Sequence, residues 1–187
     1  VEIALWDILG KHSDLPIWQL LGGKQRDHIR ILADLHAGTS YKPGDGTKVN
    51  ENNPEAMYTP EAYAAHARDA VERGYDAIKF DIDIPTLKEK DPINHVLYPA
   101  QFDKIVEIIS AIREEVGRTI DIAIDCHWHY NTSDAIRIAK ALEPFDLLWL
   151  EDPVRPENVD AMKKVTDATS TPICTGENLY MRYGFRD

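Results

Sequence analysis

The chain has 187 residues, 43% of them hydrophobic and 28% charged, which is typical of a globular protein with one substantial core. Its net charge of −11, from 32 acidic and 21 basic residues, argues against nucleic acid or an anionic membrane surface as a partner. The apolar runs are too short to cross a bilayer and the first residues do not resemble a signal peptide, so we expect a cytoplasmic protein.

The first elements are predicted from residue 28 onward. An apolar, β-branched run predicts a strand at 28–36, and a loop rich in Gly, Asn and Pro follows at 37–58. A helix then runs from Thr59 to Gly74. Thr59 suits the N-cap, Pro60 suits the first turn, and Gly74 suits the position just after the helix.

Three more strand–helix pairs and a last strand follow in the same order. Apolar runs predict strands at 75–83, 119–127, 146–153 and 171–178. Amphipathic stretches predict helices at 101–117, 132–144 and 156–169. Thr132 or Ser133 is the expected cap of the middle helix, and a second long loop covers 84–100.

This repeated strand–helix pattern predicts a parallel α/β sheet, either doubly wound or a (β/α)₈ barrel of the TIM type. Neither LGGK nor GDG matches the phosphate-binding fingerprint of a doubly wound nucleotide site. Charged residues instead end strand after strand, namely Lys79, Asp81, Asp83, Asp125, His127, Glu151, Asp152 and Glu177. A barrel assembles its active site from several strand ends, so we favour a barrel with about its first five βα units in this chain.

Three of these acids are evenly spaced. Asp125 and Glu151 lie 26 residues apart, as do Glu151 and Glu177, and one βα unit of a barrel takes roughly 30 residues. Three carboxylates at one rim repel one another unless a cation lies between them. Oxygen ligands suit Mg²⁺ and are harder than those that Zn²⁺ usually selects. The alternative is an accidental spacing of ordinary polar strand ends.

The stretch IDCHWHY, from Ile124 to Tyr130, could carry metal ligands, a proton-transfer pair or a plain polar strand end. Alternation along a strand places Asp125 and His127 on one face and Cys126 on the other, as a thiol packed against helices. Cys174, an odd number of positions from Glu177, is predicted to pack in the same way. With two cysteines 48 residues apart, we expect no disulfide framework.

Five stretches together carry a resemblance to a known family: ALWDILGKHSDLPIWQLLGG, AIKFD, AIDCH, LWLEDP and TGEN. They are similar to the mandelate racemase/muconate lactonizing enzyme-like branch of the enolase superfamily, and most similar to its galactonate- and mannonate-type sugar-acid dehydratases. The resemblance implies that Asp125, Glu151 and Glu177 bind Mg²⁺. It implies a reaction that begins with removal of the proton α to a carboxylate, by a Lys or His base.

The resemblance also suggests roles for other residues. His127 matches the general acid that protonates the departing hydroxyl of the dehydratases, although a buried structural His is the alternative. Lys79 keeps the first position of a Lys-x-Lys motif, but Asp81 replaces the second Lys, the usual base. Asp81 could therefore assist catalysis or form an ion pair with Lys79.

Loop residues complete the candidate site. His36, Tyr41, Lys42 and His129 could contact a polar substrate, or they could be solvated loop residues without a role. Residues 1–27 resemble the last helix of an N-terminal capping domain and its connection, and 28–187 resemble part of the barrel. Five units cannot close an eight-stranded barrel, so we expect this chain alone to be inactive.

The function predicted for the full-length protein is a Mg²⁺-dependent dehydratase of a small-molecule sugar acid, giving a 2-keto-3-deoxy acid. A racemase or cycloisomerase of the same superfamily is the near alternative, and a non-catalytic relative or fragment is the distant one. We also expect a homo-oligomer, and no nucleic-acid or membrane partner.

Overall fold

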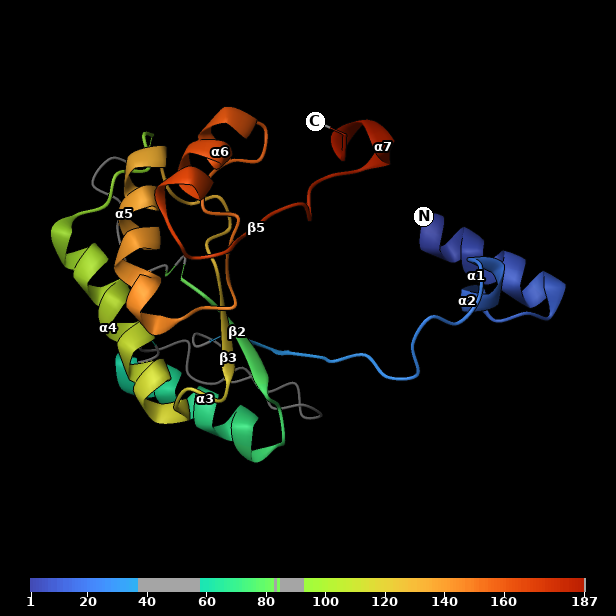
Figure 1. The fold of residues 1–187 in the computed structure, drawn as a ribbon, viewed down its shortest axis with the longest axis horizontal. Helices are drawn as coiled ribbons and strands as arrows, with labels where there is room; N and C mark the ends of the chain where they lie inside the picture. The colour runs from blue at the N-terminus through green and yellow to red at the C-terminus, as the bar shows by residue number, and fades with distance from the viewer. Residues whose placement is uncertain (37–57, 83, 85–92, 187) are drawn as a thin grey trace, which may run out of the picture. The chain divides into compact units, whose positions relative to one another are not determined.

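A computed structural model of the protein describes residues 1–36, 58–82, 84 and 93–186 (Figure 1). The chain divides into two compact units, Val1–Ile31 and Leu32–Asp187. The division falls slightly later than the boundary after residue 27 that the sequence predicts. That the first unit belongs to a capping domain stays a prediction.

The first unit contains two helices, α1 (Glu2–Ser13) and α2 (Ile17–Leu20). Asp14 ends α1 in the left-handed conformation, and the Leu15 amide donates to the Gly10 carbonyl at 3.0 Å. A Cβ on Gly10 would lie 2.9 Å from the Leu15 carbonyl oxygen, so this turn requires glycine. No helix in the parts of the chain that the structure describes is long and apolar enough to span a membrane.

The second unit is built on a five-stranded sheet in which every neighbouring pair is parallel. Its strands, in spatial and in chain order, are β1 (Ala33–Leu35), β2 (Ala77–Asp81), β3 (Asp121–Asp125), β4 (Trp149–Glu151) and β5 (Ile173–Cys174). Sequential parallel strands joined by helical crossovers confirm the predicted α/β architecture of five βα units.

Four helices lie on one side of this sheet (Figure 1). They are α3 (Pro60–Glu72), α4 (Pro99–Val116), α5 (Thr132–Leu142) and α6 (Val159–Ala168). The strand residues that face them are fully buried and apolar: Ile78, Phe80, Ile122, Ile124 and Leu150. Cys126 belongs to the same buried cluster, which confirms it as a packed thiol. We call this side of the sheet the helix-covered face.

The other side of the sheet carries the alternate residues of the same strands. Asp34, Lys79, Asp81, Asp125 and Glu151 occupy it, and we call it the polar face. In the register, Asp34 pairs with Lys79, and Asp81, Asp125 and Glu151 follow one another across three strands. Register partners in a parallel sheet point to the same side, so the sheet itself brings these charges together.

The helix caps agree with the sequence in one case and differ in another. The Thr59 hydroxyl accepts from the Ala62 amide at 3.2 Å, and Gly74 follows α3 at φ +93°, as predicted. For α5, however, neither Thr132 nor Ser133 is the N-cap. Asn131 holds that position, and its side-chain oxygen accepts from the Asp134 amide at 3.0 Å.

Three predicted strands are much shorter than their apolar runs. The strand expected at 28–36 covers only Ala33–Leu35, the one expected at 146–153 covers only Trp149–Glu151, and the one expected at 171–178 covers only Ile173–Cys174. The first and the last lie at the edges of the five-stranded sheet, where one side has no partner strand to extend the ladder. β4 lies between two partner strands and is short all the same. A short 3₁₀ helix, η2 (Glu143–Phe145), follows α5, and a last short helix, α7 (Met181–Gly184), follows β5.

Candidate active site

Lys79 forms the centre of the polar face. Its ammonium lies 3.0 Å from Oδ2 of Asp125 and 3.4 Å from Oε2 of Glu151. The three side chains are 15%, 1% and 13% exposed, so the contacts are largely shielded from water. Glu151 Oε2 also accepts from the indole nitrogen of Trp149 at 2.9 Å. Two carboxylates on adjacent strands are thus held around one cation.

The charge of Lys79 is maintained by these partners. Burial alone would lower the pKa of its ammonium, but the hydrogen bond and charge of Asp125, together with Asp34 and Glu151, raise that pKa above its usual range. An amine that is held protonated donates hydrogen bonds and does not accept a proton at neutral pH. With this pKa and these partners, Lys79 is a cation next to Asp125 and Glu151.

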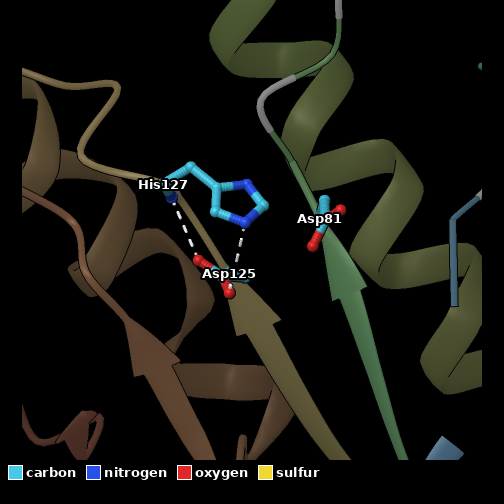
Figure 2. Close-up of side chains that lie close together, drawn as sticks. All are labelled: Asp81, Asp125 and His127. Carbon is cyan, nitrogen blue, oxygen red and sulfur yellow. Dashed lines mark hydrogen bonds and ion pairs between the residues drawn. The ribbon is translucent and has the colours of Figure 1, made fainter. Parts of the chain in front are cut away.

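His127 lies beside Asp125 at the end of β3 (Figure 2). Its Nε2 is 3.6 Å from Asp125 Oδ2, and its backbone amide donates to Asp125 Oδ1 at 3.0 Å. The predicted proximity is therefore correct, but strand alternation is not its cause. The strand ends at Asp125, and His127 and Trp128 both adopt left-handed backbone, with φ of 44° and 59°.

This left-handed turn is held from the next strand. The Cys126 amide donates to the Glu151 carbonyl at 3.0 Å, and the Trp128 amide donates to the Asp152 carbonyl at 2.8 Å. Asp152 is itself left-handed, with φ of 42°. Such conformations in non-glycine residues cost about 1–3 kcal/mol each and concentrate at functional sites. The backbone is thus constrained where His127 meets the carboxylates.

Asp81 pairs with His36 across the ends of β1 and β2. His36 Nδ1 and Asp81 Oδ2 form an ion pair, and the Asp81 backbone carbonyl accepts from the Tyr63 hydroxyl at 3.2 Å. One ligand atom from each of Asp81, Asp125 and His127 lies within 4.8 Å of the others. The sequence suggested Lys79 as a partner for Asp81, whereas the structure pairs Lys79 with Asp125 and Glu151.

Glu177 joins the site from the loop after β5. Ligand atoms of Glu151, Asp152 and Glu177 lie within 4.8 Å of one another. Asp152 is 1% exposed, and its Oδ1 has no hydrogen-bond partner among the described residues. The sequence named Asp152 only as a polar strand end, so this buried carboxylate is a feature that it did not single out.

These two groups fit a hard divalent cation. Five carboxylates and one imidazole supply mainly oxygen ligands, and they adjoin because Asp125 and Glu151 share the Lys79 ammonium. A buried carboxylate oxygen without a partner is a second sign that positive charge belongs here. Asp125, Glu151 and Glu177, the predicted ligands, are divided between the two groups.

Cys174 is the one predicted orientation that the structure overturns. It is the register partner of Glu151, so its side chain lies on the polar face and not against the helices. Burial, with the charges of Glu151 and Asp152, raises the pKa of its thiol. Counting alternation back from Glu177 failed because β5 ends at Cys174 and the chain turns at Gly176, where φ is +130°.

The predicted substrate-binding residues other than His36 are Tyr41, Lys42 and His129. Tyr41 and Lys42 lie outside the described residues. His129 lines a cavity of about 500 Å³ beside His127. Trp149 contacts Glu151 and was missed by the sequence analysis, although its position two residues before Glu151 on one strand face was a usable signal.

Parallel strands whose carboxyl ends carry acids, a lysine and a histidine define the class of α/β-barrel enzyme sites. The sequence matches the enolase C-terminal domain-like family over residues 62–187. The chain therefore belongs to that family.

Similar proteins with known names support this assignment. A D-xylonate dehydratase from Haloferax volcanii is 45% identical over 186 residues, covering 100% of this chain. A D-gluconate dehydratase from Thermoproteus tenax is 30% identical and covers 96% of it. A mandelate racemase/muconate lactonizing enzyme-like protein of known structure from Rubrobacter xylanophilus is 43% identical, with a TM-score of 0.82 over 97% of this chain.

This chain corresponds to less than half of each of those proteins. It spans 41% of the xylonate dehydratase, 31% of the gluconate dehydratase and 46% of the Rubrobacter protein. The five-stranded sheet is thus the counterpart of part of an enolase-type barrel.

Proposed function

We propose that the full-length protein is a Mg²⁺-dependent sugar-acid dehydratase that converts an aldonate to a 2-keto-3-deoxy acid. The observation that carries this proposal is the arrangement of Asp125 and Glu151 around one cation, with His127 Nε2 3.6 Å from Asp125. The names of the xylonate and gluconate dehydratases support the substrate class.

Asp125, Glu151 and Glu177 are the proposed Mg²⁺ ligands, and Asp152 stands directly beside two of them. When bound, Mg²⁺ supplies positive charge that stabilises the negative charge developing on the substrate carboxylate. Lys79 adds a second, permanent cation next to the same carboxylates and can donate to an anionic substrate. The sheet fixes Lys79, Asp125 and Glu151 before substrate arrives, because all three lie on adjacent strands and Asp125 and Glu151 are register partners.

His127 is the proposed general acid. A base removes the proton α to the carboxylate, and the electron pair of that C–H bond forms the carbon–carbon double bond of an enediolate. The bond between C3 and its hydroxyl oxygen then breaks, and His127 gives its proton to the departing oxygen, releasing water. The resulting enol becomes the 2-keto-3-deoxy acid. The hydrogen bond from the His127 amide to Asp125 holds the imidazole at this point.

Product analysis of the full-length protein tests the proposal. The protein is incubated with Mg²⁺ and a panel of aldonates and aldarates, with Glu151→Gln as the matched inactive control. We expect a 2-keto acid and one released water from at least one aldonate, and none from the control. Inversion at C2 without water loss would identify a racemase instead, and no reaction with any acid would contradict a dehydratase.

A further inference from the structure

A cavity of about 500 Å³ adjoins the candidate active site at His127. Four loops that follow β2, β3, β4 and β5 contribute to its wall. Its polar lining residues are His95, His127, His129, Arg155, Glu157 and Asn178. Three of the seven histidines of the chain therefore meet in one cavity.

The wall formed by His95 and His129 is anchored at both residues. The His95 carbonyl accepts from the Asn131 backbone amide at 3.3 Å and from its side-chain amide at 2.9 Å. The His129 amide donates to the Cys126 carbonyl at 2.9 Å, and the two imidazoles meet edge to face with ring centres 5.9 Å apart. Asn131 is also the N-cap of α5, so a helix terminus fixes this wall.

Other lining residues present groups that are available to a ligand. Neither the Arg155 guanidinium nor the Glu157 carboxylate has a hydrogen-bond or ion-pair partner among the residues that the structure describes. Arg155 only donates hydrogen bonds, Glu157 only accepts them, and Asn178 does both. Hydroxyl groups also donate and accept, so this lining matches a polyhydroxylated chain. A second anionic group fits less well, because Glu157 would repel it.

His127 connects the cavity to the reaction. It lines the cavity and also lies 3.6 Å from the buried carboxylate of Asp125. A substrate whose C3 hydroxyl meets His127 can place its remaining carbons in the cavity that His127 lines. The volume suffices for two or three hydroxylated carbons and some water, since one water takes about 30 Å³.

We propose that this cavity binds the hydroxylated tail of the sugar acid beyond C3, with Arg155 as its principal hydrogen-bond donor. The assignment rests on the dehydratase function proposed above. It makes the barrel itself, through the loop after β4, a determinant of substrate chain length.

The test compares a long and a short acid in the full-length protein. kcat/KM is measured for the aldonate that reacts fastest, and an inhibition constant is measured for the four-carbon acid of the same configuration at C2 and C3. Arg155→Met removes the charge and keeps the bulk. Arg118→Met is the matched control, because Arg118 is an exposed arginine just before β3, at the other end of the strand.

We expect Arg155→Met to lower kcat/KM for the long acid by about ten- to a hundredfold, the usual range for a lost hydrogen bond to a charged group. The inhibition constant of the four-carbon acid should change by a factor at least about fivefold smaller. This acid has no tail to contact Arg155, and the site that binds its carboxylate end is unchanged. Arg118→Met should leave both values as in the wild type.

Three results overturn the assignment, and they are distinguishable. If Arg155→Met matches Arg118→Met, the tail does not contact Arg155. If both acids are affected equally, Arg155 supports the whole site and not a tail subsite. If the wild type dehydrates no sugar acid, the proposed function fails and this inference fails with it.

Discussion

The two faces of the same sheet follow opposite rules. On the helix-covered face, Ile78, Phe80, Ile122 and Ile124 have no exposed surface and no polar atoms to satisfy. On the polar face, charged side chains lie beside particular partners, as Lys79 does beside Asp125 and Glu151. Adjacent residues of β3 therefore have different functions, because they lie on opposite faces of the sheet. The first face provides stability, and the second holds charges that would repel one another without their cation.

The largest expected effect comes from the polar face. Glu151→Gln removes a proposed Mg²⁺ ligand and one partner of Lys79, while the Lys79–Asp125 contact remains. Mg²⁺ affinity should fall by more than the roughly 10–100-fold that loss of an outer-shell partner costs, and dehydratase activity should disappear. Calorimetric titration with Mg²⁺ measures the first and product formation the second. Wild-type affinity in the variant would contradict the site.

The next prediction distinguishes the role of His127, the proposed general acid, from the role of the proposed metal ligands. His127→Asn keeps a residue that tolerates the left-handed turn but cannot protonate a leaving group. Dehydration should fall by about 10²–10⁴-fold. Exchange of the C2 proton with D₂O, followed by NMR, should persist, because it precedes loss of the hydroxyl. If exchange and dehydration fell together, His127 would have another role.

A substitution on the helix-covered face should act on stability instead. Ile124→Ala leaves a cavity between β3 and the helices, and we expect the free energy of unfolding to fall by about 2–5 kcal/mol. Val159→Ala, at a residue 53% exposed on α6, should change it by about 0.5 kcal/mol or less. Urea denaturation of both variants tests the contrast. Equal effects would show that the face is not the core of the unit.

Gly176 allows the contribution of backbone conformation to be tested without removing a carboxylate. At φ +130°, Gly176→Ala is strained although its Cβ would meet only Leu179 Cδ1, at 3.8 Å. The cost of about 1–3 kcal/mol should appear as a 5- to 150-fold weaker Mg²⁺ affinity, because Glu177 follows directly. Unchanged Mg²⁺ affinity, with a folded protein by circular dichroism, would show that the backbone conformation at Gly176 does not position a Mg²⁺ ligand.

The smallest effect is a pH dependence at the amino ends of the strands. The Ser170 amide and the Thr169 hydroxyl donate to Glu143 Oε1, at 2.8 and 2.9 Å, and hold the pKa of that carboxyl below its usual value. A lowered pKa stabilises the fold above the unfolded-state pKa, and this contribution is lost as pH falls through the folded-state pKa.

Glu143→Gln should therefore flatten part of the decline in Tm as pH falls from about 6 to about 3. The Tm of both proteins is measured by calorimetry across that range. An identical pH profile in the variant would mean that Glu143 contributes nothing to the acid sensitivity.

The fold and the first two acids could be predicted because they depend on local patterns. Apolar runs and caps give the order of elements, and the spacing of Asp125 and Glu151 matches their register in the sheet. Cys174 could not be oriented, because alternation holds only within a strand and β5 ends there. The proximity of His127 to Asp125 was predicted correctly but for the wrong reason. The prediction assumed strand alternation, whereas the strand ends at Asp125 and His127 lies in a left-handed turn.

The cavity and the orphaned carboxylate of Asp152 could not be foreseen at all. Arg155 lines the same cavity as His95 and His129 only because loops from four units converge, and no sequence spacing indicates that. The strands at 28–36, 146–153 and 171–178 were predicted too long, because an apolar run does not reveal how many of its residues join the hydrogen-bonded ladder. Homo-oligomer formation and a cytoplasmic location stay predictions.

The ammonium of Lys79 also changes how the site can assemble. A structural zinc site leaves its domain unfolded until the ion arrives. Here the ammonium of Lys79, which is part of the chain itself, already bridges Asp125 at the end of β3 and Glu151 at the end of β4. We therefore expect the sheet to form without metal, so that the proposed Mg²⁺ would bind by an exchange of partners at Asp125 and not as a step in folding. Chelation should then remove the proposed activity reversibly and leave the secondary structure intact.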